Sequence, residues 1–171
     1  MFSSKLKHHF IKKKIDKLSK ALSVQVNDKN QKIQSVAIIT HNDISLEYNF
    51  QEILIERLQL RNPRIYSYRK FNKDDEKSYK HFSKIDFDWK GEVVEPSLQS
   101  FLDEPFDLLI CFFSKKNIFL EYTALASKAT FKLGLPGLHP KLLDIQINTD
   151  ASNVDVFFEE TKKYLQIVKK L

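Results

Sequence analysis

Two short polar segments hold the side chains best suited to catalysis. Each follows an apolar run, and together they supply four candidates for acid, base or anion-binding roles: His41, Asp43, Ser114 and Lys115. If both apolar runs are parallel strands, these residues meet at the edge of the sheet where open α/β folds bind ligands. An imidazole there can exchange protons, and a helix N-terminus can hold an anion. Because Asp, Ser and Asn are also common helix caps, the same segments equally predict two capped helices without chemistry.

The first 20 residues form the second candidate site, and they carry all of the surplus charge. They hold one aspartate and seven lysines, which are Lys5, Lys7, Lys12, Lys13, Lys14, Lys17 and Lys20, whereas the other 151 residues have 21 basic and 21 acidic side chains. An apolar stripe runs along the same predicted helix through Ile11, Ile15, Leu18 and Leu22.

Two interpretations of this lysine-rich helix stay open. The lysines can bind phosphates of RNA or anionic lipid headgroups, with Phe2, Leu6 and Phe10 inserting into the membrane interface. Alternatively, the apolar stripe packs on the sheet and the lysines are a solvated outer face. Lysine lacks the bidentate fork of arginine, so readout of a nucleic-acid sequence is not expected.

All four arginines fall within residues 57–69, interleaved with tyrosines. In a strand, Arg64, Tyr66 and Tyr68 share one face, and Arg69 follows directly, which fits a surface that stacks single-stranded nucleic acid and binds its phosphates. The alternative is a strand near the sheet edge whose tyrosines cover a helix.

Several chemistries are excluded or unsupported. The three glycines, at positions 91, 134 and 137, do not have the spacing of a dinucleotide-binding or P-loop glycine motif. The single cysteine, Cys111, lies in an apolar run, so an internal disulfide is impossible and a thiolate zinc site is not expected. No metal-binding or serine-hydrolase motif occurs, so we expect no metal and no cofactor.

Apolar patterning predicts how these residues are positioned. Strands are expected at 35–40, 64–69, 106–113, 130–135 and 142–147, and helices at 43–62, 117–129 and 154–168. Repeated strand-helix-strand order predicts a three-layer α/β sandwich: a mostly parallel, Rossmann-like or flavodoxin-like sheet of about five strands, with helices on both faces.

Two regions are harder to place. Residues 71–105 lack periodicity, apart from a short strand expected near 84–89 and a helix near 97–102, and are expected to cross one edge of the sheet. The link before 142–147 is too short for a helical crossover, so this strand is expected to be antiparallel or not the immediate neighbour of the preceding one.

Length and composition are those of a soluble globular protein. The 171 residues, 42% apolar and 29% charged, suit one domain, expected at 25–171, with a basic helix at 1–24 packed on it or appended. No apolar run is long enough to cross a bilayer, and no secretory signal is evident, so a cytoplasmic location is expected.

Several longer segments carry a resemblance to a known family. They include "KLKHHFIKKKIDKL", "SVAIIT", "DFDWKGEV", "FDLLICFFSKKNIFLEYTALASKATFKLGL", "LLDIQI" and "YLQIVKKL", and they cover most of the chain. In these segments the chain resembles an uncharacterised bacterial family, a conserved domain of unknown function found in small cytoplasmic proteins. The resemblance implies one intact domain and transfers no catalytic residue.

The favoured interpretation is a non-enzymatic binding or adaptor module whose lysine-rich helix contacts RNA, the ribosome or an anionic membrane surface. The alternative is a small-molecule enzyme or sensor with a cleft near His41 and Ser114. The sequence does not indicate an oligomeric state.

Overall fold

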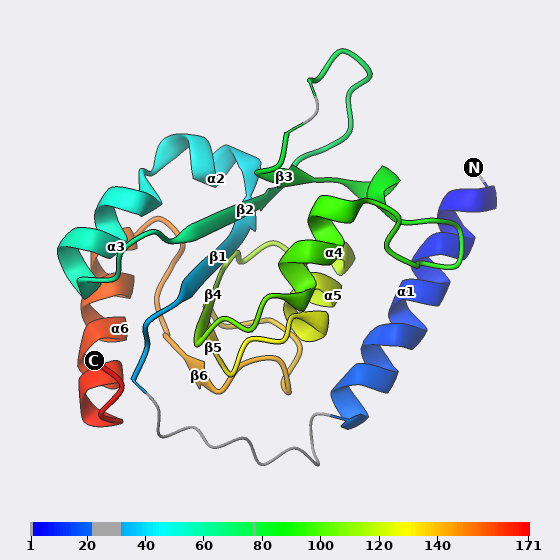
Figure 1. The fold of residues 1–171 in the computed structure, drawn as a ribbon. Helices are drawn as coiled ribbons and strands as arrows, with labels where there is room; N and C mark the ends of the chain where they lie inside the picture. The colour runs from blue at the N-terminus through cyan, green and yellow to red at the C-terminus, as the bar shows by residue number, and fades with distance from the viewer. Residues whose placement is uncertain (1, 22–31, 77) are drawn as a thin grey trace.

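The computed structural model describes residues 2–21, 32–76 and 78–171, which form a parallel sheet with helices on both faces (Figure 1). The strands are β1 (Val36–His41), β2 (Arg64–Tyr68), β3 (His81–Phe82), β4 (Leu108–Phe112), β5 (Phe131–Gly134) and β6 (Ile145–Gln146). The helices are α1 (Phe2–Ala21), α2 (Asn42–Glu47), α3 (Phe50–Leu58), α4 (Pro96–Asp103), α5 (Ile118–Ala126) and α6 (Val154–Ile167), with a 3-10 turn, η2, at Lys84–Asp86.

The sheet has the order β3-β2-β1-β4-β5-β6, and every neighbouring pair is parallel. The α/β prediction is therefore confirmed, with six strands in place of about five. The direction of winding reverses between β1 and β4. The ends of these two strands consequently lie next to each other, in the register Thr40 to Phe112.

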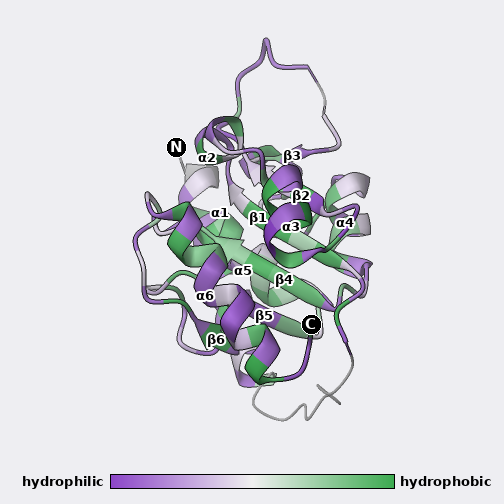
Figure 2. Cartoon of the chain, turned by 90° about the vertical axis from the view of Figure 1, so that its left-hand side faces the viewer, coloured by the Kyte–Doolittle hydropathy of each residue, from purple (hydrophilic) through white to green (hydrophobic). Residues whose placement is uncertain are grey.

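Side chains alternate along the central strands and build one core on each face of the sheet. Ile38 and Ile110 point toward α3 and α6, whereas Ile39 and Cys111 point toward the face covered by α4 and α5. Figure 2 shows β1 and β4 as apolar, with polar residues on the outer surfaces of α3 and α6. Strands buried on both faces need this continuous apolar pattern, which is why the sequence identified them.

The last strand corrects one prediction. β6 pairs directly with β5 and is parallel to it, through Leu133 to Ile145. No helix is needed for the crossover, because β6 has only two residues and the loop from 135 to 144 crosses the sheet by itself. The loop buries Leu138 and Leu142 in the core of the α5 face.

The edge strand β3 corrects a second prediction. The strand expected near 84–89 lies earlier, at 81–82, and the expected segment contains η2 instead. Ser83 begins η2 because its hydroxyl accepts from the amide of Ile85, while the Asp86 carboxylate accepts from the amide of Ser83. This reciprocal cap competes with an extended chain at these residues.

The single helix expected after β1 is divided in two. Tyr48 is extended, and the Asn49 side chain accepts from the amide of Glu52, so a new helix, α3, begins at Phe50. The expected cap Asp43 does not begin the first helix. His41 occupies that position, without a side-chain capping bond.

Helix α1 packs against α5 and against a hairpin formed by residues 86–94 (Figure 1). This 86–94 hairpin is closed by an antiparallel bridge between Phe87 and Val93, and its turn ends at Gly91. Ile11 and Ile15 are buried in the same core as α5, so the predicted apolar stripe is confirmed at these positions. Leu22 lies outside the described residues.

Gly91 places the backbone of the 86–94 hairpin directly against α1. It has φ of +70°, and a Cβ at this position would lie 2.7 Å from the Cγ1 atom of Ile11. Only a residue without a side chain allows this backbone conformation and this contact together.

We predict that Gly91→Ala lowers the free energy of unfolding more than Gly137→Ala. Both glycines have positive φ, which costs an alanine about 1–2 kcal/mol, but a Cβ on Gly137 meets no atom within 4 Å. The added overlap with Ile11 costs Gly91→Ala about 1–3 kcal/mol more. Urea unfolding of both variants measures the difference, and equal losses would show that the hairpin does not press on α1.

Candidate functional site

The lysine-rich helix α1 presents two distinct sides. Its inner side holds Ile11 and Ile15, which are 0% and 5% exposed, with Leu18 partly buried against the same core. Because residues three or four apart share a helix face, burial of this stripe directs the remaining side chains of α1 outward. The core packing therefore determines which lysines face solvent.

Two of the seven predicted lysines are engaged in holding α1 on the 86–94 hairpin. The Lys7 ammonium donates to the carbonyl of Lys84 at 2.8 Å and to that of Phe87, at the end of η2. Partial burial lowers the pKa of Lys7, against the opposing attraction of Asp88. Lys14 pairs with Glu92 at 2.6 Å. These two lysines serve the structure and are not free to bind a partner.

The other five lysines form an outward surface, hereafter the basic face. Its members are exposed in the structure and are Lys5, Lys12, Lys13, Lys17 and Lys20. In the described part of the chain, none of their ammonium groups makes an ion pair or a hydrogen bond. The surplus charge of the chain is thus concentrated on one side of one helix, where Asp16 is the only acidic side chain of α1.

The tyrosines of the nucleic-acid surface predicted on β2 pack against other side chains of the chain. Tyr66 is fully buried and stacks between Phe82 and Phe101, with ring centroids 5.2 and 4.7 Å away. The shared face of β2 points toward the core, where Tyr66 is closed to nucleic-acid bases and Tyr68 is partly buried against Phe82 and Phe119.

The arginines that flank this face have carboxylate partners. Arg64 pairs with Glu104, and Arg69 lies 3.2 Å from Asp75 while donating to the carbonyl of Glu76 at 3.0 Å. Both guanidinium groups, which the sequence predicts as part of a polyanion site, therefore have partners within the chain.

The polar segments after β1 and β4 do come together, because the two strands are neighbours. His41 Nε2 lies 3.4 Å from the carbonyl of Lys115, and its ring contacts Tyr68 and Phe113 edge-on. Part of the segment after β4 serves to cap helix α5. Asn117, and not Ser114, begins α5 by accepting from the amides of Phe119 and Leu120.

Asp43 and Ser114 have modest local roles. The Asp43 carboxylate accepts from the amide of Ile44 at 3.1 Å, within the first turn of α2, and the side chains of Ser114 and Lys115 are exposed. The four candidates are therefore near one another, but no hydrogen bond links His41 to Ser114 or Asp43 in the described residues.

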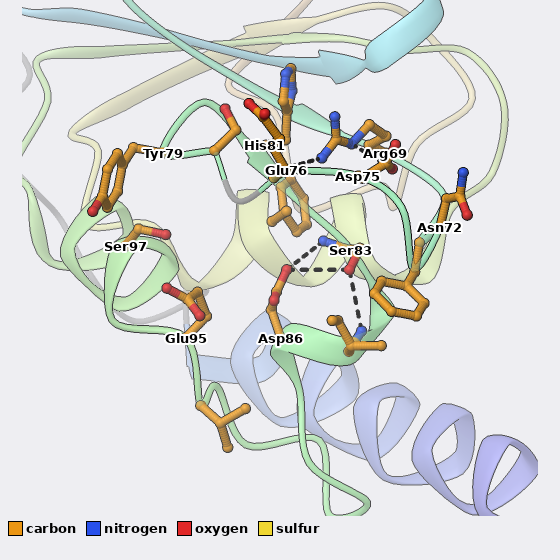
Figure 3. A pocket seen from close by; sticks show the side chains of 15 residues that line it. Arg69, Asn72, Asp75, Glu76, Tyr79, His81, Ser83, Asp86, Glu95 and Ser97 are labelled. Atoms are coloured by element: carbon orange, nitrogen blue, oxygen red, sulfur yellow. Dashed lines mark hydrogen bonds and ion pairs between the residues drawn. The ribbon is translucent and has the colours of Figure 1, made fainter.

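A pocket at the β3 edge of the sheet was not predicted (Figure 3). Its volume is about 330 Å³, and its polar lining contributes four carboxylates against one arginine: Asp75, Glu76, Asp86 and Glu95 with Arg69. Asp86 is partly desolvated, which raises its pKa, although it accepts from the Ser83 amide at 2.6 Å. Apart from Arg69, the lining residues come from the stretch at 71–97, which has no periodic signal that could have revealed them.

This edge pocket has the size and mixed lining of a small-molecule site. Phe71, Tyr79 and Val94 supply apolar surface beside the carboxylates. Its charge suits a cationic or hydrogen-bond-donating compound. Within the described residues, no group of three or more His, Cys, Asp or Glu side chains is arranged to hold a metal ion.

Burial of Tyr66 generates a prediction for alkaline pH. Desolvation raises the pKa of Tyr66 to about 12, against a weak opposing hydrogen bond with Ser97. Between pH 10 and 12 the folded state therefore binds more protons than the unfolded state, and stability falls as the pH rises. Urea unfolding at pH 9 and at pH 12 measures this fall in the free energy of unfolding. We expect the fall to be smaller by roughly 2 kcal/mol in Tyr66→Phe than in the unmodified protein. An identical decline in both proteins would contradict the burial of Tyr66.

Comparison with known proteins identifies the family. No curated protein and no solved structure matches the chain. A family model described as "Family of unknown function (DUF6913)" matches residues 7–168, which include all six strands and α1 from Lys7 onward. The chain therefore belongs to this family of unknown function.

Proposed function

We propose that the protein is a non-enzymatic binding module that contacts a polyanion through the basic face of α1. The observation that supports this function is the set of five exposed lysines without carboxylate partners. Polyanion binding by such a surface comes mainly from charge neutralisation and release of counterions. We place this activity in the cytoplasm, in keeping with the resemblance to cytoplasmic proteins noted above.

The position of α1 supports a surface role for its lysines. The helix lies at the side of the molecule opposite α3 and α6, so its outer side is open to a large partner (Figure 1). None of the described helices has the length and apolarity to cross a bilayer. The helix is held by the 86–94 hairpin, so the lysines present a fixed array.

We expect substitution of all five basic-face lysines by glutamine to weaken binding to heparin, a model polyanion, by at least tenfold at low salt. The slope of log Kd against log salt should fall as well, because fewer counterions are released. Fluorescence anisotropy with labelled heparin measures both quantities. Lys7 and Lys14 remain unchanged, so α1 stays attached.

A matched control removes the same charge elsewhere. It replaces five exposed lysines outside α1 by glutamine: Lys70, Lys73, Lys116, Lys162 and Lys169. If this variant loses as much affinity as the α1 variant, net charge and not the basic face determines binding, and the proposal fails.

A small-molecule enzyme or sensor is the second candidate. It is favoured by the strand order, which is that of Rossmann-like domains and brings His41 and Lys115 to the point where the winding reverses. Ligands of such sheets bind outside the carboxyl ends of the strands. Anionic compounds suit the lysines of this segment.

This second candidate predicts stabilisation by a small anion. In a thermal-shift screen of nucleotides, sugar phosphates and carboxylic acids, a genuine ligand should raise Tm in the unmodified protein by several degrees. The increase should be lost in His41→Ala and in Lys115→Gln. A ligand that stabilises these variants equally binds elsewhere, for example in the edge pocket.

A further inference from the structure

The tip of the 86–94 hairpin exposes a tryptophan beside α1. Trp89 is 52% exposed, although it is the only tryptophan and one of the largest apolar side chains in the protein. Its ring lies 5.9 Å from that of Phe10 on α1, and the Lys90 ammonium lies 5.1 Å from its centre. The indole is thus held at the surface between an aromatic ring and a cation.

Phe10 connects this aromatic pair to the basic face. Residues three, four and seven positions away share its side of the helix, which places Leu6, Lys13 and Lys17 in one row with Phe10. The row continues into Trp89 and Lys90 on the hairpin. Aromatic rings and unpaired lysines therefore form one continuous surface built from two elements.

We propose that this surface binds an anionic phospholipid bilayer, with Trp89 inserted at the level of the headgroups. This inference rests on the proposed function, polyanion binding by α1, and identifies the polyanion as the anionic headgroups of a lipid bilayer. Tryptophan favours the membrane interface because its ring is apolar and its N–H remains hydrated. Lysines beside it can reach anionic headgroups while their alkyl stems lie along the apolar surface.

The composition of this surface favours lipid over nucleic acid. The charges are all lysine, which binds phosphate as a point charge and lacks the planar fork that stacks on bases. Lys90 lies over the Trp89 ring and competes with a base for its face. Tyr66 of β2 is buried, and Tyr68 is partly buried and stacked on Phe119, so neither ring is presented on this surface. An anionic bilayer offers negative charge and an apolar layer without bases to recognise, so it fits the lysines, the covered Trp89 ring and the β2 tyrosines alike.

The unmodified protein carries its own reporter, since Trp89 is the sole source of tryptophan emission. It is mixed with vesicles of phosphatidylcholine, with or without phosphatidylglycerol. We expect the emission to shift to shorter wavelength, and to be quenched by brominated lipid, only when phosphatidylglycerol is present. High salt should reverse the shift, because the lysines supply the attraction.

Variants separate the aromatic and the electrostatic contributions. In vesicle co-sedimentation, Trp89→Ala should lower affinity about tenfold, and Trp89→Phe should restore most of it. Lys13→Gln with Lys17→Gln should weaken binding more than Lys5→Gln with Lys12→Gln, which removes equal charge farther from Trp89. Equal losses in these two pairs would overturn the placement of the surface, and thermal unfolding verifies that each variant is folded.

The results distinguish the two proposals. Unchanged Trp89 emission with anionic vesicles, together with salt-dependent binding to heparin or to single-stranded RNA, overturns the lipid proposal and keeps the polyanion function. Absence of binding to vesicles, heparin and RNA alike overturns both. A loss of vesicle binding in Trp89→Ala, with heparin binding retained, supports the lipid surface specifically.

Discussion

The contact between the 86–94 hairpin and α1 determines what the rest of the molecule can present. Gly91 brings the hairpin backbone against Ile11, while Lys7 and Lys14 bind the carbonyls of the 84–87 segment and the Glu92 carboxylate. These contacts use the apolar side of α1 and two of its charges. The remaining lysines must face outward, so an internal packing interaction gives the surface its charge pattern.

The two cores of the sheet make this arrangement possible. Each strand near the centre is apolar on both sides, and α5 is almost entirely buried between the sheet and α1. The buried Lys132 of β5 reaches the C-terminal end of α5. Its ammonium donates to the carbonyls of Ala124 and Ser127 there. A cation at this end of a helix also complements its dipole. The helix that supports α1 is thus fixed at its own end.

The sequence predicted those features that repeat, and missed those that depend on single residues. Continuous apolar runs identified the central strands, and the stripe through Ile11 and Ile15 identified the buried side of α1. By contrast, the division at Asn49 and the cap at Ser83 depend on one side chain each, and periodicity carries no signal for them. The buried Lys132 is similar, because a lysine in an apolar strand is ordinarily expected at the surface.

For the candidate site, the sequence gives the number of charged side chains, but it does not show which of them pair with other groups in the fold. The surplus at 1–20 was evident, whereas the engagement of Lys7 and Lys14 depends on a hairpin about 80 residues away. The alternation that grouped Arg64 with Tyr66 was correct, yet it does not say which face is buried. Trp89 was visible as an isolated aromatic, and only the fold places it beside Phe10.

The central claim is that α1 is docked on the folded body and presents its lysines from a fixed position. Native-state hydrogen exchange of the 171-residue chain, followed by NMR, tests it most directly. We expect the amides of Ile11 and Ile15 to exchange slowly, with protection approaching that of α5. Rapid exchange of these amides, with α5 still protected, would show an undocked helix and contradict the account.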